Sequence, residues 1–300
     1  MRCVRLREYL AILLQEMGWF AAARRLRRSP PRSVQPPVAF AARQGKAKRG
    51  AASAAQPYVV DTATERHLQF TADALQSRML LDDPYALISA YTRQMMSFLL
   101  FAPDPVHVLM IGLGGGSLPK FCYRHLPATQ ITVVEIDARV IALRDSFHVP
   151  PDDARFRVIC DDGARYISQL GGRVDAILID AFDAAGVAPS LATSDFFSAA
   201  ARHLTADGVL IMNLYGAPQR YAAHVEKVRA AFGGRALIAP VTAHDNVLLV
   251  ACNAAAPAPT ARELDVRARY LQSRFRLQFE SYLQRIRNGR IVAEQPAGPH

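Results

Sequence analysis

The chain has 300 residues, of which 51% are apolar and 21% are charged. This composition is too apolar for a disordered protein, and no apolar run reaches the roughly 18 residues that a membrane-spanning helix needs. We therefore expect one large domain with appendages and no membrane span. The cysteines are far apart in the sequence, which argues against a disulfide framework and favours a reducing, cytoplasmic location; they are Cys3, Cys122, Cys160 and Cys252.

The net charge of +10 belongs to one end of the chain. The first 50 residues hold 12 of the 36 Lys and Arg residues and two of the 26 acidic residues, so the remaining body has 24 of each sign. A neutral body does not indicate a nucleic-acid surface, and we expect no nucleic-acid partner. Tyr9–Leu26 could form a basic amphipathic helix, and both a targeting presequence and a solvated tail stay open for this segment.

The pattern divides the chain into four parts. Residues 1–57 are expected to be a basic tail with a Pro/Ala-rich linker, and residues 58–80 a small β region, since His67–Phe70 alternates polar and apolar side chains. A helix is expected at Tyr85–Leu100, where apolar residues recur at helical spacing. Residues 256–300 are expected to hold an amphipathic helix at Thr260–Arg287.

Residues 81–255 are expected to form the main domain. Here seven short apolar runs alternate with helix-compatible stretches, and short strands that are apolar throughout are typical of a sheet covered by helices on both faces. The sequence therefore predicts an α/β fold with a doubly wound, mostly parallel, seven-stranded sheet. The expected strands are Val108–Ile111, Ile131–Val134, Phe156–Ile159, Ala176–Ile179, Val209–Met212, Ala236–Ile238 and Val247–Val250.

A glycine cluster directly after the first core strand is the first candidate ligand site. Its glycines at Gly112, Gly114 and Gly116 would let the backbone approach a ligand closely. Glu135 ends the next strand, where a carboxylate can accept both hydroxyls of a ribose. The spacing of these glycines fits neither the dinucleotide-binding fingerprint nor a phosphate-binding loop. We therefore expect a nucleoside without phosphates, as in S-adenosyl compounds.

Two further strands end in carboxylates. Asp162-Gly163 could bind an adenine amino group, although Asp-Gly is also a common turn pair. Asp180 and Asp183 follow the fourth strand, where they could bind an amine or take its proton, although Asp183 could instead cap a helix. The scattered histidines form no HExxH or Cys/His cluster, so we expect no metal site.

These motifs resemble the spermidine synthase (polyamine aminopropyltransferase) family, a branch of the methyltransferase-like Rossmann folds. The resemblance covers about Tyr58 to Val250 and rests on the glycine loop at 108–117, Glu135-Ile136-Asp137, Asp162-Gly163 and the Asp180–Asp183 pair. It implies Gln76 and Glu135 on the nucleoside, Asp162 on adenine, Tyr91 and Asp183 on the amine substrate, and Asp180 as the proton acceptor. It also implies a transferase that uses decarboxylated S-adenosylmethionine in polyamine biosynthesis, and we expect a homodimer.

The sequence also departs from the family pattern. Gly115 replaces the aspartate that binds the donor's ammonium, which would leave room for the carboxylate of ordinary S-adenosylmethionine. The family's Tyr-His-Glu corresponds to Tyr91-Thr92-Arg93, and Arg93 would repel a polyamine if it faced the pocket. A methyltransferase and a nucleoside-binding protein without transfer activity therefore remain as alternatives.

Overall fold

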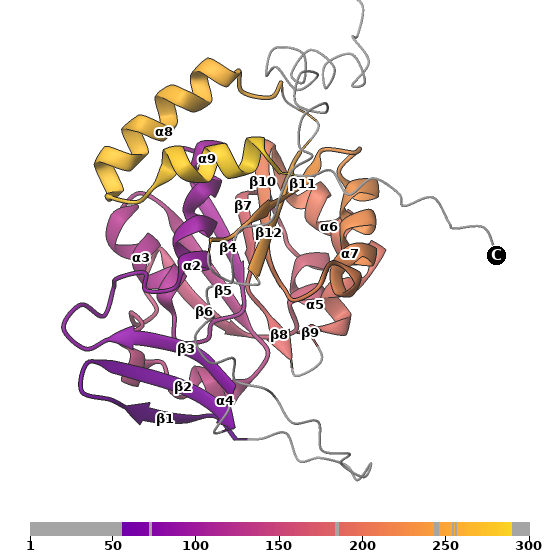
Figure 1. The fold of residues 1–300 in the computed structure, drawn as a ribbon. Coiled ribbons are helices and arrows are strands. Elements are labelled where there is room, and N and C mark those ends of the chain that lie inside the picture. Colours follow the sequence, from indigo (N-terminus) through magenta and orange to yellow (C-terminus); the bar gives the residue numbers. More distant parts are fainter. Residues whose placement is uncertain are drawn as a thin grey trace, which may run out of the picture. The chain divides into compact units, whose positions relative to one another are not determined.

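All seven expected strands form one sheet in the computed structural model (Figure 1). The structure describes residues 56–71, 74–183, 186–242, 246–253, 255 and 257–289, so the basic tail lies outside the described residues. The sheet order is β11-β12-β10-β7-β4-β5-β6. The strands are β4 (His107–Ile111), β5 (Gln130–Glu135), β6 (Phe156–Cys160), β7 (Val174–Ile179), β10 (Leu204–Tyr215), β11 (Ala236–Pro240) and β12 (Asn246–Cys252).

Neighbours from β10 to β6 are parallel, whereas β12 is antiparallel to both β10 and β11. The chain moves from β4 outward to β5 and β6, and then returns to the other side of β4 to form β7 and β10. This reversal creates a switch point between β4 and β7, which is where open α/β sheets bind their ligands. The predicted fold class is confirmed.

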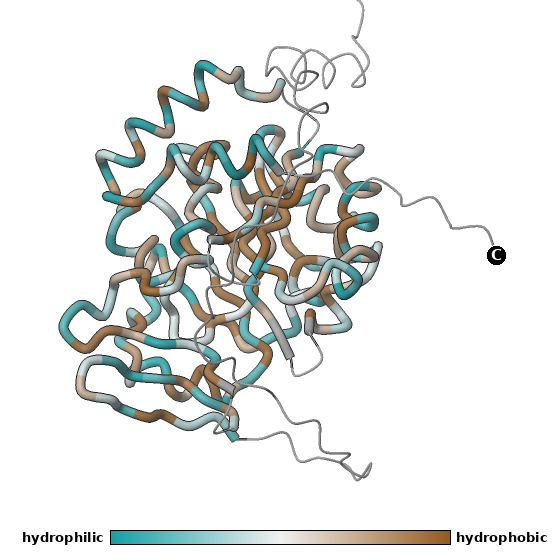
Figure 2. The backbone as a smooth tube through the Cα atoms, in the orientation of Figure 1, coloured by the Kyte–Doolittle hydropathy of each residue, from teal (hydrophilic) through white to brown (hydrophobic). Residues whose placement is uncertain are grey.

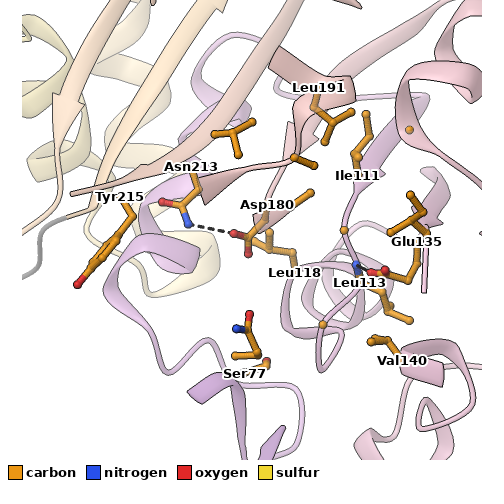
Figure 3. A pocket seen from close by; sticks show the side chains of 18 of the residues that line it. Ser77, Ile111, Leu113, Leu118, Glu135, Val140, Asp180, Leu191, Asn213 and Tyr215 are labelled. Carbon is orange, nitrogen blue, oxygen red and sulfur yellow. Dashed lines mark hydrogen bonds between the residues drawn. The ribbon is translucent and has the colours of Figure 1, made fainter. Parts of the chain in front are cut away.

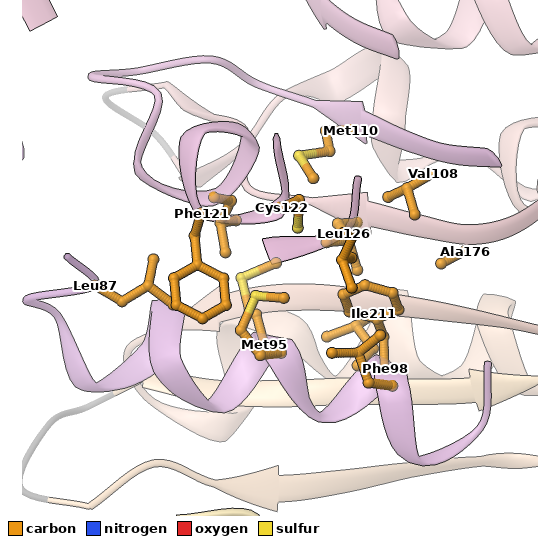
Figure 4. Close-up of a cluster of buried hydrophobic side chains, with 14 of the residues drawn as sticks. Leu87, Met95, Phe98, Val108, Met110, Phe121, Cys122, Leu126, Ala176 and Ile211 are labelled. Carbon is orange, nitrogen blue, oxygen red and sulfur yellow. The ribbon is translucent and has the colours of Figure 1, made fainter. Parts of the chain in front are cut away.

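Alternate residues of each central strand pack against opposite layers of helices, and the apolar residues concentrate in these strands (Figure 2). In β4, Val108 and Met110 contact the first layer, while Leu109 and Ile111 contact the second. Figure 4 shows the first layer, where Phe98 and Phe121 lie over the sheet. This layer includes α2 (Ala90–Met95), η1 (Met96–Leu100), α3 (Ser117–His125) and α9 (Phe279–Arg287). The second layer includes α5 (Gly163–Ser168), α6 (Ser194–His203) and α7 (Pro218–Ala231).

A small antiparallel sheet precedes the main sheet in the chain. Its strands are β1 (Tyr58–Asp61), β2 (Glu65–Thr71) and β3 (Ala74–Leu80). Leu68 and Met79 are each 1% exposed and join the main core, which holds this sheet beside the glycine loop. Gln76 therefore lies on a strand and is exposed on its surface.

The helix expected at Tyr85–Leu100 begins later than predicted, at Ala90. Ser89 is still extended at ψ 137°, and the preceding residues form a turn. The Arg93 guanidinium donates hydrogen bonds to the carbonyls of Leu87 and Ile88, which satisfies these acceptors without a helical turn. Apolar periodicity alone does not reveal that the Arg93 side chain donates hydrogen bonds to these two carbonyl groups.

The C-terminal region forms two helices rather than the one expected. A capping box of Thr260 and Glu263 starts α8 (Ala261–Phe275), and Arg276 ends it with a left-handed φ of +55°. The chain then turns into α9, whose apolar face packs on the core. In the described part of the chain, no helix is both long and apolar enough to cross a bilayer.

A buried lysine links α3 to the segment that covers the glycine loop. Lys120 is 0% exposed, and its Nζ donates a 2.7 Å hydrogen bond to the Phe147 carbonyl at the end of η2 (Asp145–Phe147). Burial, together with the nearby Arg124 charge, lowers the pKa of Lys120 to about 7. The Phe147 ring in turn lies beside Gly115.

We expect Lys120 to make the protein more stable as the pH rises above about 7. The folded protein then releases a proton that the unfolded chain retains up to its ordinary lysine pKa, so the free energy of unfolding increases by at most about 1.4 kcal/mol per pH unit. Lys120→Met should lack this contribution. Urea unfolding of both proteins at pH 7, 8 and 9 measures it, and parallel pH dependences would contradict the assignment.

Candidate active site

The carboxyl ends of five strands surround a cleft of about 740 Å³ (Figure 3). The strands are β4, β5, β6, β7 and β10, so residues distant in the sequence meet because parallel strands end at the same edge. Most of the predicted site residues line this cleft: Gln76, Tyr91, Gly112, Gly114, Glu135, Asp162, Gly163 and Asp180. Gly116 is not among the lining residues.

Two positions of the loop require glycine because of their backbone conformation and of close packing. Gly112 has φ +96°, and a Cβ there would lie 2.2 Å from the Asp180 carbonyl oxygen. Gly116 has φ +68° at the start of α3, where a Cβ would lie 2.4 Å from Val149 Cγ2. Both conformations favour glycine over residues with a side chain. Because Gly112 has no side chain, the end of β4 can pack closely against the end of β7. The missing side chain at Gly116 likewise allows the start of α3 to pack against Val149.

Glu135 faces the cleft with its carboxylate held in place by backbone donors. One oxygen accepts the Leu113 N–H at 2.8 Å, and the other accepts the Asp137 N–H at 2.9 Å. Each carboxylate oxygen can accept a further hydrogen bond. Glu135 is therefore fixed next to the glycine loop while it retains acceptor capacity for two ligand hydroxyls.

Asp162 combines a structural role with a position in the cleft. Its Oδ1 accepts the N–H groups of Ala164 and Arg165, both at 2.9 Å, and caps α5. Burial acts to raise its pKa, but hydrogen bonds from Arg165, Ser190 and Ala164 outweigh burial and lower the pKa. Asp162 thus remains a hydrogen-bond acceptor at the edge of the cleft.

Asp180 lies at the floor of the cleft, at the end of β7. Its Oδ1 accepts a 2.9 Å hydrogen bond from Asn213 Nδ2, which Figure 3 shows as a dashed line, and the Tyr91 hydroxyl also donates to it. Burial raises the pKa of Asp180, and these two donors reduce that shift. The pKa of Tyr91 is raised well above its usual value by burial and by the negative charge of Asp180. Asp180 is therefore a desolvated carboxylate whose hydrogen-bond donors are neutral.

Other predicted features are placed differently. Asp183 pairs through its backbone with Gly186, where β8 (Phe182–Asp183) meets β9 (Gly186–Val187), and its side chain lies outside the description. Arg93 does not line the cleft because it donates to the backbone before α2. The concern that Arg93 would repel an amine therefore does not apply.

The surroundings of Gly115 are narrow, and the space expected there for a donor carboxylate stays a prediction. A Cβ at this position would lie 2.7 Å from Ser77 Oγ and 3.0 Å from Phe147 Cδ1. Ser77 on β3 and Phe147 at the end of η2 therefore lie close to Gly115 and leave little free space beside it. A longer side chain here would have to displace these two neighbouring side chains, which a sequence pattern does not reveal.

Several lining residues were missed by the sequence analysis. Asn213 and Tyr215 directly follow an expected strand, so its carboxyl end could have indicated them. Asn246 begins β12, and it reaches this edge only because β12 runs antiparallel. Arg220 and His224 come from α7, and no motif marks them. Within the described ranges, no group of three or more His, Cys, Asp or Glu residues is arranged to hold a metal ion.

The sheet topology defines a methyltransferase-like α/β fold, with carboxylates at the strand ends that line the cleft. The spermine/spermidine synthase domain model matches residues 88–232. A polyamine aminopropyltransferase of Chromobacterium violaceum is 37% identical over 234 residues, which are 78% of this chain and 88% of the relative. The chain belongs to this family, and it is accordingly a transferase. The family resemblance predicted from the sequence is confirmed.

Solved structures agree at the level of fold. A probable spermidine synthase from Corynebacterium glutamicum has a TM-score of 0.60 and 20% identity, covering 72% of this chain and 83% of that chain. Human methyltransferase-like protein 13 in complex with SAH has a TM-score of 0.57 and 23% identity, covering 63% of this chain and 93% of that chain. The shared fold therefore includes both aminopropyl- and methyltransferase-like proteins.

We expect Glu135→Ala to weaken binding of methylthioadenosine by roughly 10- to 100-fold, because it removes charge-assisted hydrogen bonds to the ribose. The variant should stay folded but lose some stability, since the N–H groups of Leu113 and Asp137 lose their acceptor. Calorimetric titration measures the affinity. Asp137→Asn is the control, because Asp137 caps α4 (Ala138–Ile141) and does not line the cleft. Equal affinity in Glu135→Ala and the wild type would contradict the ribose assignment.

Proposed function

We propose that this cleft transfers the aminopropyl group of decarboxylated S-adenosylmethionine to a primary amine, as a step in polyamine biosynthesis. The proposal rests mainly on one observation: Asp180, a desolvated carboxylate, lies in the same cleft as the nucleoside-binding candidates Glu135 and Asp162. Membership of the spermine/spermidine synthase family supports the same activity. The cytoplasmic location and the homodimer stay predictions.

The chemistry requires an amine without its extra proton. The amine nitrogen attacks the aminopropyl carbon that is bonded to the sulfonium, the carbon–sulfur bond breaks, and its electron pair stays on sulfur to give methylthioadenosine. Asp180 would accept the proton that the attacking amine loses. Burial brings the pKa of Asp180 closer to neutrality, which makes it a better proton acceptor than an exposed aspartate.

The family relationship favours the decarboxylated compound over ordinary S-adenosylmethionine as the donor. The alternative of methyl transfer depends on free space beside Gly115, where a Cβ would already lie 2.7 Å from Ser77 Oγ and 3.0 Å from Phe147 Cδ1. A protein that only binds nucleosides would not need a carboxylate with two neutral donors at the floor of the cleft. Asp180, with Asn213 and Tyr91, therefore favours an active transferase.

We expect Asp180→Asn to keep methylthioadenosine affinity but to slow aminopropyl transfer by roughly 10²–10⁴-fold, the usual contribution of a positioned base. Asparagine keeps the shape of the side chain and cannot accept the proton. Single-turnover transfer with saturating donor measures the effect, and Asp104→Asn, at an exposed position outside the cleft, is the control. An Asp180→Asn enzyme as fast as the wild type would exclude Asp180 as the base.

The lining of the cleft also includes a cation. Arg220 lines the cleft, and its guanidinium has no acidic partner within the part of the chain that the structure describes. An acceptor whose reacting nitrogen lies at Asp180 would bring a second ammonium group toward Arg220. This charge arrangement disfavours acceptors with a positive far end.

We therefore expect Arg220→Gln to lower KM for 1,4-diaminobutane by about three- to tenfold, because repulsion between two unit charges at the cleft surface is removed. KM for 1-aminobutane, which has the same length and no second charge, should change by less than about twofold. Steady-state kinetics with the two amines provides the comparison. An equal change for both amines would mean that Arg220 does not sense the far end of the acceptor.

A further inference from the structure

Two asparagines extend the polar contacts of Asp180 into the sheet. Asn246 Nδ2 donates to Asn213 Oδ1 at 3.0 Å, and Asn213 Nδ2 donates to Asp180 Oδ1 at 2.9 Å. The register of β10 with β12 places Asn246 opposite Tyr215, two residues along the strand from Asn213. Since opposite residues share a face and alternate residues return to it, the two asparagines meet on the cleft side.

A carboxamide has a donor end and an acceptor end, so its direction determines what it offers to a neighbour. Asn213 is only 4% exposed, so water has little access to either end. While Asn246 donates to its oxygen, the Asn213 NH₂ group must point toward Asp180. The reversed amide would set an oxygen against Asp180, which is favourable only when Asp180 carries a proton.

We propose that Asn246 fixes the direction of the Asn213 amide and thereby keeps Asp180 ionised and able to accept a proton. Asn246 would be a positioning residue that acts through Asn213. The consequence for catalysis rests on the proposed function, because it matters only if Asp180 is the base. The amide arrangement itself does not depend on that role.

Other titratable or charged groups lie in the cleft around Asp180 and remain unchanged in the test below. From α2, Tyr91 donates to the carboxylate, and from β3, Arg78 acts on Tyr91. Glu135 on β5 and Asp162 after β6 add negative charge to the cleft. On α7, Arg220 carries a positive charge, while burial and then Lys227 lower the pKa of His224.

The test compares Asn246→Leu, which removes the donor without adding charge, with Asn246→Gln, which retains an amide donor. Labelled-aspartate NMR, with the Asp180 signal assigned through Asp180→Asn, follows the titration of Asp180 directly. We expect the Asp180 pKa to rise by at least about one unit in Asn246→Leu and to move back toward the wild-type value in Asn246→Gln. If Asn246→Leu does not fold, Asn246→Ala removes the same donor with less bulk.

The pH profile of aminopropyl transfer provides the functional measurement. In Asn246→Leu, the acidic limb of kcat/KM should move to higher pH, with transfer at least tenfold slower at low pH and largely restored at high pH. A merely structural role would lower the rate equally at all pH values. In an Asn213→Leu background, Asn246→Leu should have little further effect, because the residue through which it acts is already gone.

The outcomes separate the inference from the proposed function. A wild-type enzyme that transfers no aminopropyl group at any pH would overturn the proposed function, and the NMR titration would still decide whether Asn246 controls Asp180. An unchanged Asp180 titration in Asn246→Leu, or in Asn246→Ala where that variant replaces it, would overturn the inference even if Asp180→Asn abolishes transfer.

Discussion

The close approach of β4 to the end of β7 at Gly112 is the constraint on which the site depends. The Asp180 N–H donates to the Ile111 carbonyl at 2.9 Å, and the Gly112 N–H donates to the Val134 carbonyl at 2.9 Å. Three strand ends are therefore joined by backbone hydrogen bonds at the switch point of the sheet. A side chain at Gly112 would collide with the Asp180 backbone and separate these strands. Glu135 and Asp180 face one cleft because this junction is tight.

The cleft carboxylates are stabilised in a way that leaves their charge available to a ligand. Glu135 is held by backbone N–H groups, Asp162 by the first turn of α5, and Asp180 by an amide and a phenol. None of the three takes part in a salt bridge among the described residues. A cationic partner would compensate each charge permanently. Neutral donors instead fix the carboxylates while leaving their negative charge to attract a sulfonium or an amine.

The positions that depart from the family pattern have structural roles of their own. Arg93 satisfies backbone carbonyls before α2, so its charge is directed away from the amine site. Gly115 is enclosed by Ser77 and Phe147, and the buried Lys120 donates to the Phe147 carbonyl. Among the residues that line the cleft, Arg220 on α7 carries a positive charge. Divergence at these motif positions therefore gives little information about the charge in the cleft, to which Arg220 contributes although no motif includes it.

The sequence by itself determined the seven core strands, the fold class and the carboxylates at Glu135, Asp162 and Asp180, because short apolar runs and strand-end residues are local features of the chain. It could not determine where the helix near Arg93 begins, since a side chain competes there with the backbone helix for carbonyl groups. Nor could it associate Asn246 with Asp180, because these residues meet only after β12 pairs antiparallel with β10. The position of Arg220 in the cleft and the narrow surroundings of Gly115 likewise depend on packing between segments that lie far apart in the chain. Local patterns specify which residues form strands, whereas the direction of the final strand and the contacts across the cleft exist only in the folded sheet.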